Sequence, residues 1–113
     1  MFNMAGNYEE RNVDTYDENG LFIDTARVTD GRQPYETAVA HPNYNGGKMV
    51  IVEAYNTKKQ ARVGHNKWVK TMTAFPLPLE LRDCHNSRIS QFGATLLGDD
   101  FGGGKFETTE EIE

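Results

Sequence analysis

The sequence lacks several features that would place it in a specialised class of protein. It contains one cysteine, Cys84, so an intramolecular disulfide is impossible and a disulfide-stabilised secreted scaffold is excluded. No apolar run approaches the length that spans a membrane, and residues 1–10 lack the charged-then-apolar pattern of a signal peptide. We therefore expect a cytosolic protein with no membrane contact.

Positive charge is also scarce. The net charge is −5 and the pI is near 5.2, whereas nucleic-acid surfaces depend on clustered lysine and arginine. The exception is one segment that contains Lys58, Lys59, Arg62, Lys67 and Lys70. A helix with this charge is most often a solvated face, so an acidic or neutral-polar protein surface is a better partner for it than DNA.

Apolar residues make up only 37% of the chain and the mean hydropathy is −0.68, so the core must be concentrated in part of it. The length of 113 residues fits one domain. We expect a flexible N-terminal arm over residues 1–11 and a single α+β domain over residues 12–97. Residues 98–113 then form a glycine-rich joint and an acidic tail.

Two β-hairpins are predicted in the first half of the chain. Asn19-Gly20 lies between two β-prone runs, residues 13–16 and 21–28. A type I′ turn requires positive φ at both central positions, and Asn-Gly is the usual pair for it. With this turn, Tyr16 faces Ile23. Residues 35–41 and 49–55 form the second hairpin.

The second hairpin is apolar on both faces. If Val39 lies opposite Val50, one face contains Tyr35, Thr37, Val39, Val50, Val52 and Ala54. The other face contains Ala38, Ala40, Met49 and Ile51. A sheet that is apolar on both sides is covered twice. The predicted helix covers one side, and either the C-terminal segment or another subunit covers the other.

An amphipathic helix follows the second hairpin. Thr57 and Gln60 have the spacing of a capping box. The apolar side of the helix contains Ala61, Gly64, His65, Trp68 and Met72. Gly64 is explained by close approach to the sheet, and Trp68, Gly64, Val50 and Val52 are the predicted structural core. The expected fold is thus a small antiparallel sheet of two hairpins on one helix, with extended arms.

The remaining segments are less regular. Leu77, Leu79 and Leu81 alternate like a short extended piece after a proline-rich break. Residues 89–97 suit a helix or a strand equally well.

The side chains that are capable of chemistry do not form a known catalytic frame. Cys84 and His85 are adjacent, so on an extended chain they point to opposite faces and His85 is poorly placed to activate the thiol. His65 is expected to be a structural histidine at the sheet edge beside Trp68, and a metal site formed with His41 and His85 is a remote alternative.

Acidic and glycine-rich segments give no stronger signal. Glu36 and Glu53 lie opposite each other in the expected register, but like charges there are unfavourable, so a shifted register or solvent exposure is favoured. Gly102-Gly103-Gly104-Lys105 lacks the residues that follow in a phosphate-binding loop, and Asp99-Asp100 lacks the spacing of a calcium loop. We expect no catalytic residue, no metal and no cofactor, and hence no enzyme.

Aromatic side chains are unusually frequent in the expected loops and arms: Phe2, Tyr8, Tyr44, Phe75, Phe101 and Phe106. They either anchor the chain to a partner or fold back over the open sheet face. The predicted partner-binding residues are Ala38, Ala40, Met49, Ile51, Tyr44, Phe101 and Phe106.

The central unit, residues 35–69, also has a recognisable sequence pattern. It contains Tyr35-Glu36-Thr37-Ala38-Val39, His41-Pro42, Tyr44-Asn45, Gly47, Met49-Val50-Ile51-Val52-Glu53, Tyr55, Thr57-Lys58, Gly64-His65 and Trp68. This stretch resembles small proteins of tailed bacteriophages and prophages that have no assigned activity. The resemblance implies a phage origin and no mechanism.

Two functions are consistent with these observations. The first is a non-enzymatic protein-binding or assembly module of a bacteriophage, a virion or virion-assembly component that forms homo-oligomers or binds phage structural proteins. It would reside in the host cytoplasm or in the virion. The alternative is a small anti-defence or host-takeover protein that inhibits a host protein or sequesters a nucleotide.

Overall fold

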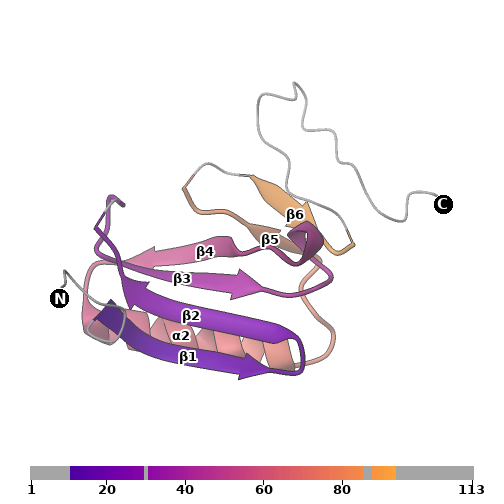
Figure 1. The fold of residues 1–113 in the computed structure, drawn as a ribbon, viewed down its shortest axis with the longest axis horizontal. Coiled ribbons are helices and arrows are strands. Elements are labelled where there is room, and N and C mark those ends of the chain that lie inside the picture. The colour runs from indigo at the N-terminus through magenta and orange to yellow at the C-terminus, as the bar shows by residue number, and fades with distance from the viewer. Residues whose placement is uncertain (1–10, 30, 86–87, 94–113) are drawn as a thin grey trace, which may run out of the picture.

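The computed structural model describes residues 11–29, 31–85 and 88–93. Its main sheet is antiparallel, with the strand order β1-β2-β3-β4. The strands are β1 (Asn12–Glu18), β2 (Leu21–Arg27), β3 (Tyr35–Ala40) and β4 (Val50–Tyr55). Helix α2 (Lys58–Thr73) covers one face of this sheet, as Figure 1 shows. The predicted α+β class is confirmed.

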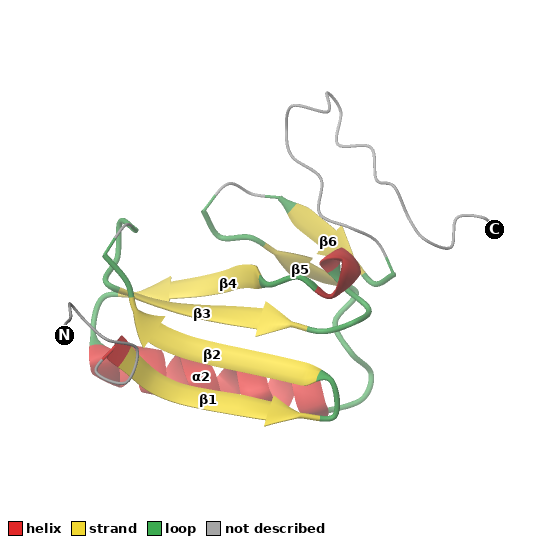
Figure 2. Ribbon diagram, viewed as in Figure 1, coloured by secondary structure: helices red, strands yellow, loops and turns green. Residues whose placement is uncertain are grey.

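A second, two-stranded antiparallel sheet lies beside β4 (Figure 2). It consists of β5 (Glu80–Arg82) and β6 (Ile89–Gln91), and a short 3-10 turn, η1 (Asn45–Gly47), precedes β4. Of the extended piece expected over Leu77, Leu79 and Leu81, only Leu81 lies in β5. In the described part of residues 89–97, the open choice between helix and strand is settled as strand. The expected arms lie outside the described residues, apart from Arg11.

The first hairpin has the predicted turn and register. Asn19 and Gly20 both have positive φ, 55° and 83°, and Tyr16 pairs with Ile23. Strand β2 then pairs with β3, so the two predicted hairpins form one continuous sheet. The N–H of Val28 donates to the carbonyl of Pro34 at 2.7 Å and closes the connecting loop.

The register of the second hairpin matches the prediction near the turn and differs from it from Thr37 towards Tyr35. Val39 lies opposite Val50 as expected, but a β-bulge between Thr37 and Ala38 places Thr37 opposite Glu53 instead of Val52. Val52 is the additional residue on β4. Because side chains alternate along a strand, the bulge turns Glu53 towards α2 and Ala54 away from it, which reverses the predicted orientation of Ala54.

Helix α2 begins with the predicted capping box. The Oγ1 of Thr57 accepts a hydrogen bond from the N–H of Gln60 at 3.1 Å, and the side-chain oxygen of Gln60 accepts one from the N–H of Thr57 at 3.2 Å. Gly64 lies where the helix meets β4, and a Cβ at this position would overlap the ring of Tyr55. The expected close approach of helix and sheet is confirmed.

The core lies between α2, the sheet and the chain before β5. Its fully or nearly buried members are Leu21, Ile23, Val39, Tyr44, Val50, Met72 and Leu81. Trp68 and Val52 are partly buried and pack against this cluster, so Trp68 borders the core instead of forming its centre. None of the described helices is long and apolar enough to cross a membrane.

Candidate functional site

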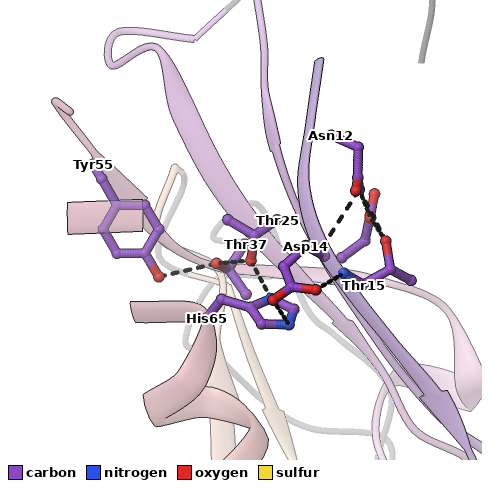
Figure 3. Close-up of polar contacts among 8 residues, drawn as sticks. Asn12, Asp14, Thr15, Thr25, Thr37, Tyr55 and His65 are labelled. Atoms are coloured by element: carbon purple, nitrogen blue, oxygen red, sulfur yellow. Dashed lines mark hydrogen bonds and ion pairs between the residues drawn. The ribbon is translucent and has the colours of Figure 1, made fainter. Parts of the chain in front are cut away.

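A buried chain of polar side chains joins α2 to three strands (Figure 3). Thr25 of β2 lies at its centre, with its Oγ1 2.7 Å from Nδ1 of His65 and 2.6 Å from Oγ1 of Thr37. Oγ1 of Thr37 is in turn 3.0 Å from the hydroxyl of Tyr55. The Tyr55 hydroxyl donates to Oε1 of Glu53 at 3.2 Å. The chain therefore runs from the helix to the edge strand β4.

The carboxylate of Glu53 fixes the direction of these hydrogen bonds. A carboxylate only accepts, so Tyr55 donates to it, Thr37 donates to Tyr55, and Thr25 donates to Thr37. Each hydroxyl has one proton, so Nδ1 of His65 must donate to Thr25. This is the assignment in which every contact has one donor, and it makes His65 the Nδ1–H tautomer.

The group His65, Thr25 and Asp14 contains the residue types of a catalytic triad, but its geometry is structural. The side chain of Thr25 is fully buried, and the hydroxyl is held by two hydrogen bonds, so a substrate has no access to it. Nε2 of His65 lies 4.0 Å from Oδ2 of Asp14, beyond hydrogen-bond distance. Burial lowers the pKa of His65 and favours its neutral form, against the opposing charge of Asp14. The ring lies over the inner strand β2, not at the sheet edge as expected.

Glu53 is the point at which this chain reaches the surface. Its Oε1 also accepts hydrogen bonds from Nε1 of Trp68 at 2.8 Å and from Nζ of Lys67 at 2.7 Å. Partial burial opposes ionisation, but the contacts with Lys67 and Trp68 outweigh it and lower the pKa of Glu53. Glu53 is therefore an ionised anchor between β4 and α2, with its acceptor oxygen already occupied.

The second carboxylate of the predicted pair lies on the opposite face. Glu36 points away from α2 because it alternates with Thr37 along β3, and the bulge places Ala54 opposite it instead of Glu53. Its Oε2 lies 2.6 Å from Nε2 of His85, which follows β5. The bulge thus separates Glu36 from Glu53, and of the two alternatives that the sequence favoured, a shifted register and solvent exposure, the shifted register is observed.

Cys84 is exposed, and its environment favours the protonated thiol. Burial of the sulfur, followed by the charges of Asp83 and Glu36, raises the pKa of the thiol to about 11. His85 contacts Glu36 instead of the thiol. Within the described residues, no group of three histidine, cysteine or acidic side chains is arranged to hold a metal ion.

One outer strand edge of the described sheet, that of β4, is bordered by clefts. Strand β4 is the last strand in the sheet order, and Cys84 pairs with it at one point, where its N–H donates to the carbonyl of Ile51 at 2.8 Å. Glu53 and Tyr55 pair with Thr37 and Tyr35 of β3. Ala54 lies opposite Glu36, but the hydrogen bond from Val28 to Pro34 indicates that Glu36 bonds through its backbone to β2, so the backbone of Ala54 points outward. We call the segment Val52–Tyr55 the β4 edge.

Two clefts border the β4 edge, one on each side of the strand. The α2 cleft has a volume of about 550 Å³, and it is lined by Gln33, Glu53, Ala54, Tyr55, Asn56, Lys59, Gln60, Val63, Gly64 and Lys67. The loop cleft has a volume of about 470 Å³, and it is lined by Gly31, Arg32, Gln33, Val52, Glu53, Ala54, Cys84 and His85. Gln33, Glu53 and Ala54 belong to both clefts. This site could not be predicted from the sequence, because the pattern of β4 does not show which edge stays open.

The partner-binding residues predicted from the sequence are not gathered at this site. Ala38 is buried, Ala40 and Ile51 are half-buried, and Met49 is 45% exposed. Figure 1 looks onto the face of the sheet opposite α2, to which Ala38, Ala40 and Ile51 belong. Phe101 and Phe106 lie outside the described residues.

Tyr44 corrects a sequence prediction. It was expected either to anchor a partner or to fold back over the open sheet face, and it was included among the predicted partner-binding residues, but its side chain is 0% exposed. Its hydroxyl donates to the carbonyl of Pro78 at 2.6 Å, and its ring packs edge-on against His41 and Phe92. The turn before β4 therefore folds inward, because β5 and β6 provide the apolar surface that Tyr44 covers. A residue so buried does not contact a partner.

Exposed apolar side chains occur instead around the second sheet. Phe75 is 94% exposed, and Leu79 is 84% exposed. The N–H of Phe92 donates to the carbonyl of Leu79 at 2.9 Å, so these two residues continue the β5–β6 ladder. The sequence singled out Phe75 as exposed but not Leu79 or Phe92.

Comparisons with known proteins do not extend this description. No protein-family model matches the sequence, and no curated protein or solved structure matches the chain significantly.

Proposed function

We propose that the protein is a non-enzymatic protein-binding module of a bacteriophage, either a virion component or an assembly factor, and that it binds its partner at the β4 edge. The observation that carries the binding role is the open strand edge with a cleft on each side. Unpaired strand edges are templates for pairing with another chain, and most proteins protect them. The phage context rests on the resemblance of residues 35–69 to small phage proteins.

The state of the reactive groups supports binding over catalysis. The hydroxyl of Thr25 is buried, the thiol of Cys84 has a raised pKa, and the carboxylate of Glu53 is held by three donors. Thr25 and Glu53 are thus held by structural partners, and the thiol of Cys84 stays protonated at neutral pH. A catalytic base or nucleophile needs an accessible position and a pKa near the working pH.

Mass spectrometry of purified phage particles, together with affinity purification from infected cells, tests the proposal. We expect the tagged full-length protein to be present in particles or to co-purify with a phage structural protein. An Ala54→Pro variant should lose this association, because proline removes the outward N–H of the β4 edge. Asn66→Ala, an exposed substitution on α2, is the matched control and should retain it.

Two results contradict the proposal. One is a strictly monomeric protein that is absent from particles and from complexes with structural proteins. The other is co-purification of a host protein with the wild type from lysates of uninfected cells, which would favour the host-takeover alternative.

A further inference from the structure

The geometry of the β4 edge points to the chemistry of its partner. We propose that the β4 edge binds a short, extended, acidic segment of another polypeptide, which adds as a fifth strand. The inference rests on the proposed binding function and specifies the partner of the same site. Backbone hydrogen bonds would hold the segment, and its side chains would alternate between the two clefts.

The backbone of β4 defines the register and length of this segment. The N–H of Cys84 occupies the carbonyl of Ile51, so an added strand begins beyond this residue. Ala54 then offers an outward N–H and an outward carbonyl, which together pair with one residue of the incoming strand. Strand β4 ends at Tyr55, so the segment that fits is only about four residues long.

The clefts suit the two faces of an added strand. Successive side chains of a strand point to opposite faces, and the clefts lie on opposite faces of the β4 edge while sharing Glu53 and Ala54. The α2 cleft contains Val63, which is 65% exposed. It accommodates a β-branched or other apolar side chain.

The charges around the β4 edge select an acidic segment. Lys59 and Lys67 line the α2 cleft, and Arg32 lines the loop cleft. The acid among these lining residues, Glu53, is already paired with Lys67 at 2.7 Å. Lys59 makes no ion pair with any described residue, so its charge is available to a ligand. An acidic strand is therefore attracted to both sides of the edge, although the whole chain is negative.

A labelled hexapeptide, Thr-Glu-Val-Glu-Thr-Glu, provides the test, with binding to the full-length protein measured by fluorescence anisotropy. The counterpart Thr-Lys-Val-Lys-Thr-Lys has the same β-propensity and the opposite charge. We expect the acidic peptide to bind and the basic peptide to bind at least about ten-fold more weakly, with the difference reduced at high salt. Peptides methylated at alternate amide nitrogens separate backbone pairing from simple charge attraction. One methylation pattern should abolish binding and the other should retain it, because a strand pairs through every second amide.

Charge variants of the protein locate the binding site. Lys59→Glu should weaken binding of the acidic peptide about ten-fold, whereas Lys70→Glu, on the same helix but outside both clefts, should change it less than about two-fold. Circular dichroism confirms that both variants are folded.

Several results would overturn the inference. These are no anisotropy change up to about 1 mM acidic peptide, the weak end of specific affinities, equal binding of both peptides, and equal tolerance of the two methylation patterns. Stronger peptide binding by a full-length variant with Glu107, Glu110 and Glu111 changed to Gln would also overturn it, since it would identify the chain's own C-terminal segment as the occupant. Co-purification with a phage structural protein despite a failed peptide assay would leave the binding function intact and refute only the acidic strand.

Discussion

Replacing Gly64 by alanine tests the packing of α2 against the sheet. In an exposed helix interior this change stabilises by about 1 kcal/mol, because glycine is a poor helix former. Here the new Cβ would overlap the ring of Tyr55, which must move. Movement of the ring costs roughly 1–3 kcal/mol in overpacking. It also weakens the hydrogen bonds of the Tyr55 hydroxyl to Thr37 and Glu53, each worth about 1 kcal/mol.

The expected net effect is a loss of about 1–2 kcal/mol of unfolding free energy, measured by urea denaturation, and a decrease in Tm of roughly 5–10 °C. A double-mutant cycle with Tyr55→Leu identifies the cause. In that background the obstructing ring is absent, so Gly64→Ala should become stabilising by up to about 1 kcal/mol. A stabilised single variant, or the same loss in both backgrounds, would refute the close approach of helix and sheet as the reason for this glycine.

Three further predictions concern the titratable groups. The pKa of His65 is lowered by burial, so the unfolded state takes up protons first as the pH falls. Stability should therefore decrease below about pH 6.5, with a smaller slope in His65→Asn. Nitrogen-15 NMR should identify the Nδ1–H tautomer, and an Nε2–H signal would contradict the hydrogen-bond assignment. The pKa of Glu53 is also lowered, so its contribution is present above about pH 4.5 and lost below it, and Glu53→Gln should cost about 1 kcal/mol and shift the fluorescence of Trp68, the single tryptophan. With its pKa raised to about 11, Cys84 should react with iodoacetamide at pH 8 roughly ten-fold more slowly than a free thiol. The thiolate fraction is small at this pH, and the higher nucleophilicity of a thiolate with a raised pKa offsets only part of the loss. An equal rate would show that the pKa of the thiol is not raised.

The local features of the fold were predictable because short sequence signals determine them. Asn19-Gly20 requires a type I′ turn, and Thr57 with Gln60 satisfies the first turn of the helix. Gly64 on an apolar helix face indicated the contact later seen with Tyr55. In each case the controlling residues are close in sequence, or one residue type permits only one arrangement.

The features that define the candidate site depend on distant contacts. The expected repulsion between Glu36 and Glu53 favoured a shifted register, but the residue pattern of β4 did not show where the shift lies, so the orientation of Ala54 was mispredicted. Tyr44 follows proline and asparagine in a turn and resembles an exposed anchor. Its burial depends on Leu81 and Phe92, which come from segments that had no clear pattern. The polar chain around Thr25 joins residues 40 positions apart, which hydrophobic periodicity does not detect.

The bulge at Val52 makes the β4 edge irregular, and deleting Val52 tests whether a regular edge pairs with another chain. Deleting Val52 leaves Glu53 opposite Thr37 and Ala54 opposite Glu36, so the deletion retains every pair beyond the bulge and makes the β4 edge regular. Bulges discourage uncontrolled pairing of strand edges, so the deletion variant should self-associate more than the wild type in sedimentation velocity. Val52→Ala loses the same packing against the core but keeps the bulge, and it should sediment like the wild type. If both variants sediment like the wild type, a regular β4 edge does not pair with another chain, and the case for strand addition at this edge is lost.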